Sequence, residues 1–153
     1  MNRTILACLL ALGLTTTACT HDFGVQVPKG FAAVHDGDRY DFRATDAEGV
    51  VIGVREKDND PQGDLAFWSG AIDAKLRAAG YQAVAQKPTE SRDGISGRQL
   101  RYRIDRGGRD HAFWVTVFVT QGHVVTVEAG GDLAFFAEKE KAIEASIASV
   151  SAS

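Results

Sequence analysis

Three consecutive strand-like stretches in the second half of this chain constrain its fold more than any other feature. Arg98–Asp105 alternates apolar and polar side chains, the pattern of a strand with one buried face. Ala112–Val119 is almost entirely apolar, which predicts a central strand covered on both faces. His123–Ala129 is the third stretch. Because Gly107-Gly108 and Gln121-Gly122 supply turns between the three, we expect an antiparallel meander.

The first half of the chain carries weaker strand signals. Val25–Val34 predicts two brief extended pieces. Arg39–Thr45 alternates, and Val50–Glu56 is a β-branched run that we expect to pair with it across a turn. Tyr81–Val84 begins another strand, which we expect to fade before Pro88.

The phrase Gly-Asp-Leu-Ala-Phe occurs twice and predicts where two helices begin. Asp64 and Asp132 can each accept hydrogen bonds from the first free N–H groups of a helix. Gly80 is suited to end the first helix, and Gly130-Gly131 is expected to end the strand before the second. The apolar stripes are Leu65, Trp68, Ile72, Leu76 and Ala79 in the first helix, and Phe136, Ile143, Ile147 and Val150 in the second.

This order of elements predicts the α+β class: a mainly antiparallel sheet with two principal helices packed on it, in one domain over residues 25–153. The entry segment VQVPKGF, the strand pair, the helix carrying AFW with Gly80-Tyr81 after it, the meander and the final helix resemble the Mog1/PsbP-like proteins. In bacteria these include small envelope lipoproteins of the DcrB type. The resemblance implies an accessory or binding role, and it brings no shared catalytic residues.

The N-terminal residues predict a lipoprotein signal peptide over residues 1–18. Arg3 supplies a positive start, and the apolar run that follows is shorter than the about 18 residues of a transmembrane helix. Ala18 before Cys19 resembles the lipobox, in which the lipidated Cys becomes the first mature residue, although Thr16 stands where the lipobox usually has Leu. Residues 19–24 would then form a lipidated tether.

Cysteine usage and the following residue refine the predicted location. Cys8 would be removed with the signal, which leaves Cys19 without a disulfide partner and favours its lipidation. Thr20, in place of Asp, resembles lipoproteins sent to the outer membrane, facing the periplasm. The alternative is cleavage and secretion into the periplasm. The expected partners are the membrane, through the anchor, and an envelope protein.

Charge and residue spacing argue against several other classes of protein. With 17 basic and 20 acidic residues the formal net charge is −3, which disfavours nucleic-acid binding. The histidines lack metal-ligand spacing, and His111 with His123 across a hairpin is the nearest to a pair. Asp58–Asp64 resembles part of an EF-hand loop but has Ser69 at the twelfth position, which favours a solvated loop. We therefore expect no metal, no cofactor and no enzymatic activity.

Two sets of side chains are candidate binding surfaces. Arg39 and Arg43 lie on the outward register of one predicted strand, and Arg101 and Arg103 on that of another. If these strands are neighbours, the four guanidinium groups form a basic patch for an anionic glycan, a lipid head group or a partner loop. The alternative is a solvated strand face paired with nearby acids. The aromatic residues that flank the helical stripes are expected to cover a sheet edge or border a groove.

These observations favour a lipid-anchored, non-enzymatic envelope domain that acts by binding. The alternatives are a binder of a small apolar or anionic ligand in a groove between helix and sheet, and a hydrolase with an unrecognised site. A pocket of several hundred Å³ would favour the groove binder, and His with carboxylates converging in a cleft would favour the hydrolase.

Overall fold

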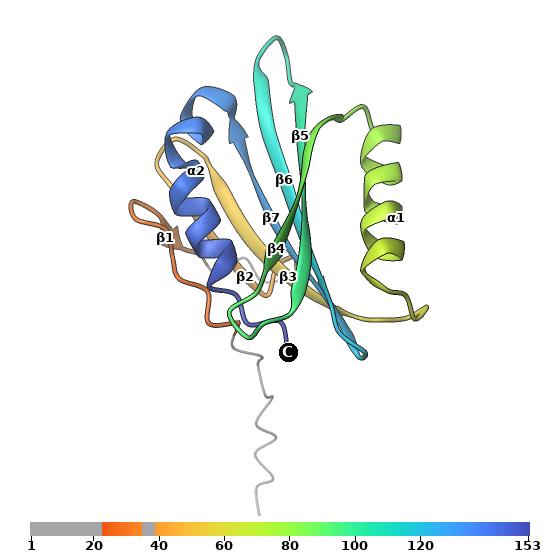
Figure 1. The fold of residues 1–153 in the computed structure, drawn as a ribbon. Helices are drawn as coiled ribbons and strands as arrows, with labels where there is room; N and C mark the ends of the chain where they lie inside the picture. The colour runs from red at the N-terminus through yellow and green to blue at the C-terminus, as the bar shows by residue number, and fades with distance from the viewer. Residues whose placement is uncertain (1–22, 35–38) are drawn as a thin grey trace, which may run out of the picture.

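A computed structural model describes residues 23–34 and 39–153, and within them seven strands and two helices (Figure 1). Cys19, Thr20 and the predicted signal peptide lie outside the described residues. The elements are β1 (Ala32–Ala33), β2 (Phe42–Thr45), β3 (Val51–Asp58), α1 (Leu65–Ala78), β4 (Gln82–Glu90), β5 (Ser96–Asp105), β6 (Asp110–Val119), β7 (His123–Asp132) and α2 (Leu133–Ala148).

The strands form one sheet in the order β1-β2-β3-β7-β6-β5-β4, and every neighbouring pair is antiparallel. β5, β6 and β7 form the predicted meander, and β3 pairs with β7 along its whole length. The α+β prediction is confirmed.

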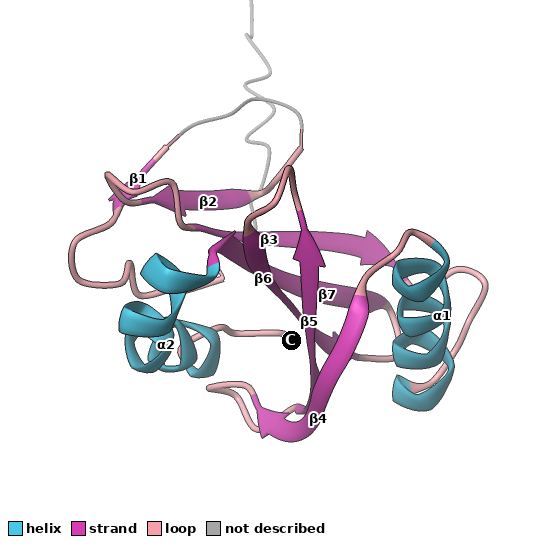
Figure 2. Cartoon of the chain, turned by 90° about the horizontal axis from the view of Figure 1, so that it is seen from above, coloured by secondary structure: helices cyan, strands magenta, loops and turns pink. Residues whose placement is uncertain are grey.

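The two helices pack on opposite faces of the sheet, as Figures 1 and 2 show. Side chains of β6 alternate between these faces. Trp114 and Phe118 belong to the buried cluster that contains the α2 residue Phe136. Val115 and Val117 belong to a second cluster, against which the apolar stripe of α1 packs. Successive side chains of β6 therefore pack against α2 and α1 in turn, which explains why the strand is apolar in both registers from Ala112 to Val119, with Thr116 as the exception.

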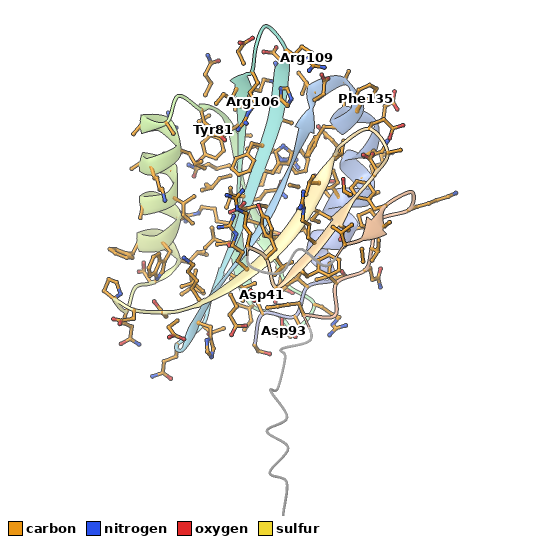
Figure 3. The ribbon with its side chains drawn as sticks, turned by 180° about the vertical axis from the view of Figure 1, so that it is seen from behind. Asp41, Tyr81, Asp93, Arg106, Arg109 and Phe135 are labelled. Atoms are coloured by element: carbon orange, nitrogen blue, oxygen red, sulfur yellow. The ribbon has the colours of Figure 1, made fainter. Side chains whose placement is uncertain are left out.

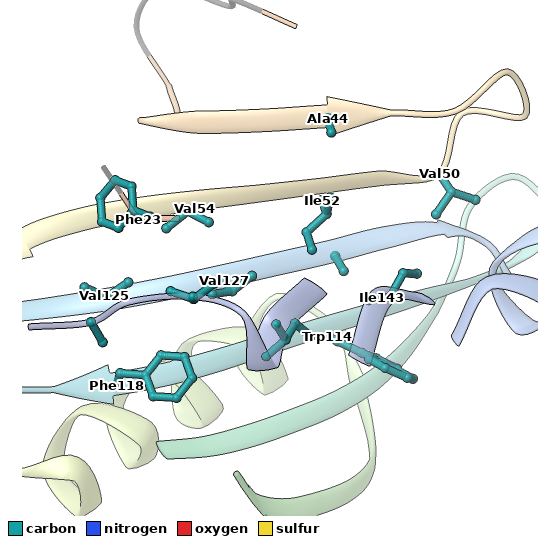
Figure 4. Packing of buried hydrophobic residues seen from close by; sticks show 14 of the residues in the cluster. Phe23, Ala44, Val50, Ile52, Val54, Trp114, Phe118, Val125, Val127 and Ile143 are labelled. Atoms are coloured by element: carbon teal, nitrogen blue, oxygen red, sulfur yellow. The ribbon is translucent and has the colours of Figure 1, made fainter. Parts of the chain in front are cut away.

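The larger core lies between α2 and the sheet (Figure 4). Phe136, Ile143 and Ile147 of α2 are at most 1% exposed. The Trp114 ring meets the Phe136 ring edge-on, with 4.8 Å between the ring centroids. Strands β3 and β7 add the β-branched residues Ile52, Val54, Val125 and Val127 to this core.

Both helices begin at the predicted capping residues. Asp64 accepts a hydrogen bond from the Phe67 backbone N–H at 2.7 Å, and Asp132 accepts one from Ala134 N–H at 3.1 Å. Gly80, with φ +91°, follows the end of α1. These contacts satisfy N–H groups that the first turn of a helix leaves unpaired.

Two strand predictions need correction. β4 does not fade before Pro88 but runs to Glu90, because β5 pairs with it over this whole stretch. β7 does not end at Gly130-Gly131 but continues to Asp132. A Cβ atom at Gly131 would lie 3.0 Å from a methyl group of Val50, so glycine here allows neighbouring backbone to approach closely.

The N-terminal segment of the described chain is fixed to the end of α2. Phe23 is 4% exposed, and its carbonyl accepts a hydrogen bond from Ser151 N–H at 2.8 Å. Gln26 donates its N–H to the Ser149 hydroxyl at 2.8 Å and accepts a bond from the Ser146 hydroxyl at 2.6 Å. Phe23 therefore belongs to the folded domain, and the predicted tether of residues 19–24 extends too far.

Asp93, in the turn between β4 and β5, holds the last residues of the chain. Its carboxylate accepts hydrogen bonds from the backbone N–H groups of Ala152 at 3.0 Å and Ser153 at 2.7 Å, and from the hydroxyls of Ser151 and Ser91. We call this group of residues the C-terminal clasp. Figure 3 places Asp93 at one end of the molecule and Arg109 at the other.

Candidate binding cleft

Helix α1 is attached to the sheet mainly along β5 and β6. Ser69 is its one buried side chain, and its hydroxyl accepts a hydrogen bond from Arg98 of β5 at 2.8 Å. The Tyr102 hydroxyl, also from β5, donates to the Asp73 carboxylate at 2.7 Å. This bond lowers the pKa of Asp73, although burial opposes the shift. The side of α1 that faces β7 and β3 has no comparable attachment among the described residues.

The loop before α1 is held by one buried amide. The Asn59 side chain donates hydrogen bonds to the carbonyls of Gly63 at 3.0 Å and Thr120 at 2.9 Å. Its oxygen accepts bonds from Gly63 N–H at 2.9 Å and from the Trp68 indole at 2.7 Å. This network fixes Trp68 at the beginning of α1. Within residues 23–34 and 39–153, no three His, Cys, Asp or Glu side chains are grouped so that they could hold a metal ion.

A cleft of about 500 Å³ opens between α1 and strands β3, β7 and β6. Its apolar lining comes from the stripe of α1 and from alternate residues of β6 and β7. These are Trp68, Ala71, Ile72, Leu76, Phe113, Val115 and Val124. The stripe residues stay half-buried because no part of the described chain covers the cleft side of α1. The volume falls in the range of roughly 300–1,000 Å³ that is usual for small-molecule sites.

The opposite side of the cleft is polar and organised around Glu128 of β7. Its carboxylate accepts hydrogen bonds from the Tyr40 hydroxyl at 2.8 Å and from the Arg55 guanidinium at 3.0 Å. Arg55 also lies over the Tyr40 ring, 4.4 Å from its centroid. The Tyr40 ring covers Gly53, where a Cβ atom would come within 2.6 Å of it.

Burial and hydrogen bonding shift two of these groups. Burial raises the pKa of Tyr40, and the neighbouring Glu128 adds to this effect while Arg55 opposes it. Burial lowers the pKa of Arg55, but its contacts with Tyr40 and Glu128 outweigh this and raise the pKa. Tyr40 and Arg55 therefore keep their protons at neutral pH and act as hydrogen-bond donors.

Two lysines border the cleft from different elements. Lys57 comes from β3 and Lys75 from α1, and both are exposed. Neither forms an ion pair with another described residue. Asp58 and Asp60 also lie at the border. The Asp58 carboxylate lies 3.9 Å from His123 Nδ1, and its side chain is 90% exposed.

Comparisons with known proteins identify the fold. No family model matches the sequence, and no curated protein matches it. LpqN, involved in cell envelope biogenesis of Mycobacterium tuberculosis, is 12% identical, with a TM-score of 0.68 over 83% of this chain and 80% of that one. Cyanobacterial PsbP from Synechocystis is 14% identical, with a TM-score of 0.57 over 83% and 84%. The chain has the Mog1/PsbP-like fold.

A third solved structure supports this result. A Pseudomonas aeruginosa protein of unknown function is 15% identical to this Mog1/PsbP-like domain, with a TM-score of 0.51 over 84% of this chain and 85% of that one. Among the described residues, no helix is long and apolar enough to cross a membrane.

The predicted four-arginine patch does not form in this Mog1/PsbP-like domain. Strands β3, β7 and β6 separate β2, which carries Arg43, from β5, which carries Arg101 and Arg103. By strand register, the Arg43 side chain lies on the face of the sheet against which α1 packs. Arg101 and Arg103 lie on the opposite face, against which α2 packs. Arg39 precedes β2, so it lies at the same edge of the sheet as Arg43. The prediction assumed neighbouring strands, and the insertion of β7 beside β3 makes that assumption wrong.

Arg101 has a structural role instead. Its guanidinium lies over the Trp114 ring, 3.6 Å from the centroid, and forms an ion pair with Glu144 of α2. It also donates to the Gln99 side chain at 2.6 Å. The pairing with an acid agrees with the predicted alternative of a solvated strand face paired with nearby acids, but the Arg101 side chain is only 11% exposed and is not solvated.

The histidine pair is also separated in the structure. His111 pairs with Asp132 and His123 with Asp58, so the two histidines lie at opposite ends of the β6–β7 ladder. The flanking aromatics Phe67 and Phe135 are exposed, at 50% and 42%. Sequence analysis missed Lys57, Lys75 and the Tyr40–Glu128 contact, because the signal that joins them is strand register and not spacing along the chain.

Proposed function

We propose that this Mog1/PsbP-like domain is a cell-envelope accessory protein that acts by binding, with the cleft beside α1 as its binding surface. The observation that carries the proposal is the cleft itself: an apolar wall from α1 and β6 facing hydrogen-bonding and charged groups from β3 and β7. Such a combination suits ligands or partner segments that have both an apolar and a polar part.

Two further findings support a role in the envelope. The fold is similar to that of LpqN, which is described as involved in cell envelope biogenesis. The N-terminal sequence has the pattern of a lipoprotein signal over residues 1–18, followed by Cys19. We propose that Cys19 carries acyl chains that hold the domain at the outer membrane, facing the periplasm. Two or more chains make such anchoring durable, whereas one chain binds only marginally.

We propose binding without catalysis as the role of the cleft. Within the described residues, the cleft lining contains Lys, Arg, Asp, Glu and Thr side chains but no His, Cys or Ser. A hydrolase that uses a Ser or Cys nucleophile would need that residue with a His base in hydrogen-bond reach. We therefore propose that binding takes the form of one predicted alternative, in which an apolar or anionic ligand occupies a groove between helix and sheet.

The anchor is tested by fractionation. Cys19→Ser should move the protein from the detergent-soluble membrane fraction to the aqueous fraction, and growth with a labelled fatty acid should label only the wild type. Unchanged partitioning of the variant would refute the anchor and favour another means of retention.

The binding surface is tested by photo-crosslinking in intact envelopes. A photoreactive amino acid at Ala71, which lines the cleft, should give a discrete adduct. The matched control is Ala74, which is exposed on α1 but does not line the cleft. A lipid adduct would indicate a ligand and a protein adduct an envelope partner. Equal products from both positions, or none from Ala71, would refute the cleft as the binding surface.

A further inference from the structure

We propose that the cleft binds a single-chain anionic amphiphile, meaning one alkyl chain that ends in a carboxylate or phosphate group. The inference rests on the proposed binding function and names the class of ligand. Three features of the cleft support it: the exposed apolar wall, the lysines at the border and the dimensions.

The apolar wall of the cleft is left partly exposed by the described residues. Trp68, Ile72 and Leu76 are half-buried, whereas the corresponding stripe of α2 is completely buried. Phe113 and Val115 of β6 continue this apolar surface into the floor of the cleft. Covering such a surface is favourable in proportion to the apolar area removed from water. An alkyl chain lying along α1 would cover it without needing hydrogen-bond partners.

The charges at the border favour an anion. Lys57 and Lys75 face this region from β3 and α1 and have no ion pair among the described residues. Arg55 and Glu128 neutralise one another. The two remaining acids are Asp58 and Asp60, in the polar stretch that leaves β3.

Asp58 lines the border of the cleft at the end of β3, where its side chain is 90% exposed. By strand register it lies beside His123, on the face that α2 covers, and its carboxylate is near the His123 ring. The side chains that extend over the floor from β3 are therefore Arg55 and Lys57. The border carries equal numbers of charges, with Lys57 and Lys75 against Asp58 and Asp60, but the two lysines have no ion pair among the described residues, whereas Asp58 lies 3.9 Å from the His123 ring. Lys57 and Lys75 are therefore placed to contact the head group of an anionic amphiphile.

The dimensions favour one alkyl chain. The lining residues of α1 extend from Trp68 to Leu76, which is about 12 Å along the helix axis. The cleft follows this single helix, and its volume of about 500 Å³ includes the space for the head group.

The ligand class is tested with the full chain carrying Cys19→Ser, purified without detergent and titrated with dodecyl phosphate. Trp68 lines the cleft, whereas Trp114 is 4% exposed on the other face. The tryptophan emission should therefore shift on binding, also in a Trp114→Phe background. Neutral dodecyl maltoside should bind about tenfold more weakly, because it lacks the charge that the lysines attract.

Matched variants locate the head group and the chain. Lys57→Ala combined with Lys75→Ala should weaken dodecyl phosphate binding about tenfold. Lys29→Ala combined with Lys141→Ala removes the same charge at exposed positions elsewhere and should change binding less than about twofold. Ala71→Trp fills the cleft and should abolish binding, whereas Ala74→Trp should not. Circular dichroism and thermal melting confirm that each variant is folded.

Each outcome decides between the class of ligand and the site. Equal binding of dodecyl phosphate and dodecyl maltoside, or equal effects of the two lysine pairs, would overturn the requirement for an anion. Equal binding by the Ala71→Trp and Ala74→Trp variants would overturn the location. If dodecyl phosphate does not bind while Ala71 still gives its adduct in envelopes, the ligand class is wrong and the proposed function stands. Loss of that adduct would contradict the proposed function itself.

Discussion

The two helices of this domain begin with nearly the same sequence but differ in how deeply they are buried. Asp64 caps α1 and Asp132 caps α2, and each is followed by Leu-Ala-Phe and a second aromatic residue. In α2 that aromatic, Phe136, is 0% exposed, whereas in α1 it is the half-buried Trp68. The shared phrase therefore specifies the start of a helix, and the sheet face opposite it determines how deeply the helix is buried.

The difference between the two faces is one of side-chain type. Opposite α2, strands β3 and β7 present Ile52, Val54, Val125 and Val127, so the helix is covered on both flanks. Opposite the free flank of α1, the same strands present Arg55 and Glu128. Such charged groups are costly to bury beneath a helix, and the space beside α1 stays open.

The comparison is tested most strongly by the same substitution in both helices. Ile143→Ala in α2 should lower the free energy of unfolding by about 4 kcal/mol, because it leaves a cavity in a fully buried site. Ile72→Ala in α1 should cost about 1–2 kcal/mol, because its side chain is already half-exposed. Urea denaturation followed by circular dichroism measures both values. Equal losses would contradict the unequal burial of the two helices.

A smaller effect should distinguish the attachment of α1 from that of α2. Tyr102→Phe removes the hydroxyl that donates to Asp73, a bond to a charged group worth about 1.5 kcal/mol. Proteolysis or hydrogen exchange should then increase in α1 and leave α2 unchanged. The matched control is Tyr81→Phe, whose hydroxyl accepts an exposed contact from Arg106. Similar losses in the two variants would show that the Tyr102–Asp73 bond does not hold α1.

The smallest expected effect concerns acid. Burial opposes ionisation of Asp93, but hydrogen bonds from Ser153, Ser91 and Ala152 outweigh it and hold the pKa of its carboxyl well below the usual value of 3.8. A pKa lowered by folding gives stability that is present above pH 3.8 and is lost as the pH falls below it. Because Asp93 is exposed, we expect a loss of less than about 1 kcal/mol.

The Asp93→Asn variant sharpens this measurement. Its stability should fall less steeply than that of the wild type between pH 4 and pH 2, and the N–H groups of Ala152 and Ser153 should exchange faster at neutral pH. Asp73 of α1, whose pKa is also lowered, supplies the comparison through Asp73→Asn. A pH profile that Asp93→Asn leaves unchanged would show that the C-terminal clasp contributes no acid sensitivity.

Local patterns predicted much of this fold. Alternation and turn signals predicted β5, β6 and β7, and the two Asp caps predicted both helix starts. β4 was underestimated because its exposed edge position gives Gln82–Glu90 little apolar alternation. The assignment of the helices to opposite faces follows from the parity of side chains along β6, which has apolar residues in both registers.

The site was less predictable than the fold. A groove between helix and sheet was among the predicted alternatives, but its residues depend on strand order. β7 returns to pair with β3, which brings Glu128 beside Arg55 and separates Arg43 from Arg101. The spacing of residues along the chain does not predict the pairing of β7 with β3, because this long-range pairing depends on the packing of the whole hydrophobic core. The prediction of a four-arginine patch was wrong for this reason.

The fastening of Phe23 and Gln26 to the end of α2 has a mechanical consequence. If Cys19 carries the proposed acyl chains, the four residue-to-residue steps from Cys19 to Phe23 can span at most about 14 Å. A pull on this anchor would load the bond between Ser151 and Phe23 and the bonds to Ser146 and Ser149 first. Force would therefore pass first into the side of the domain that α2 and its buried core form, and α1 with its cleft lies on the other face of the sheet.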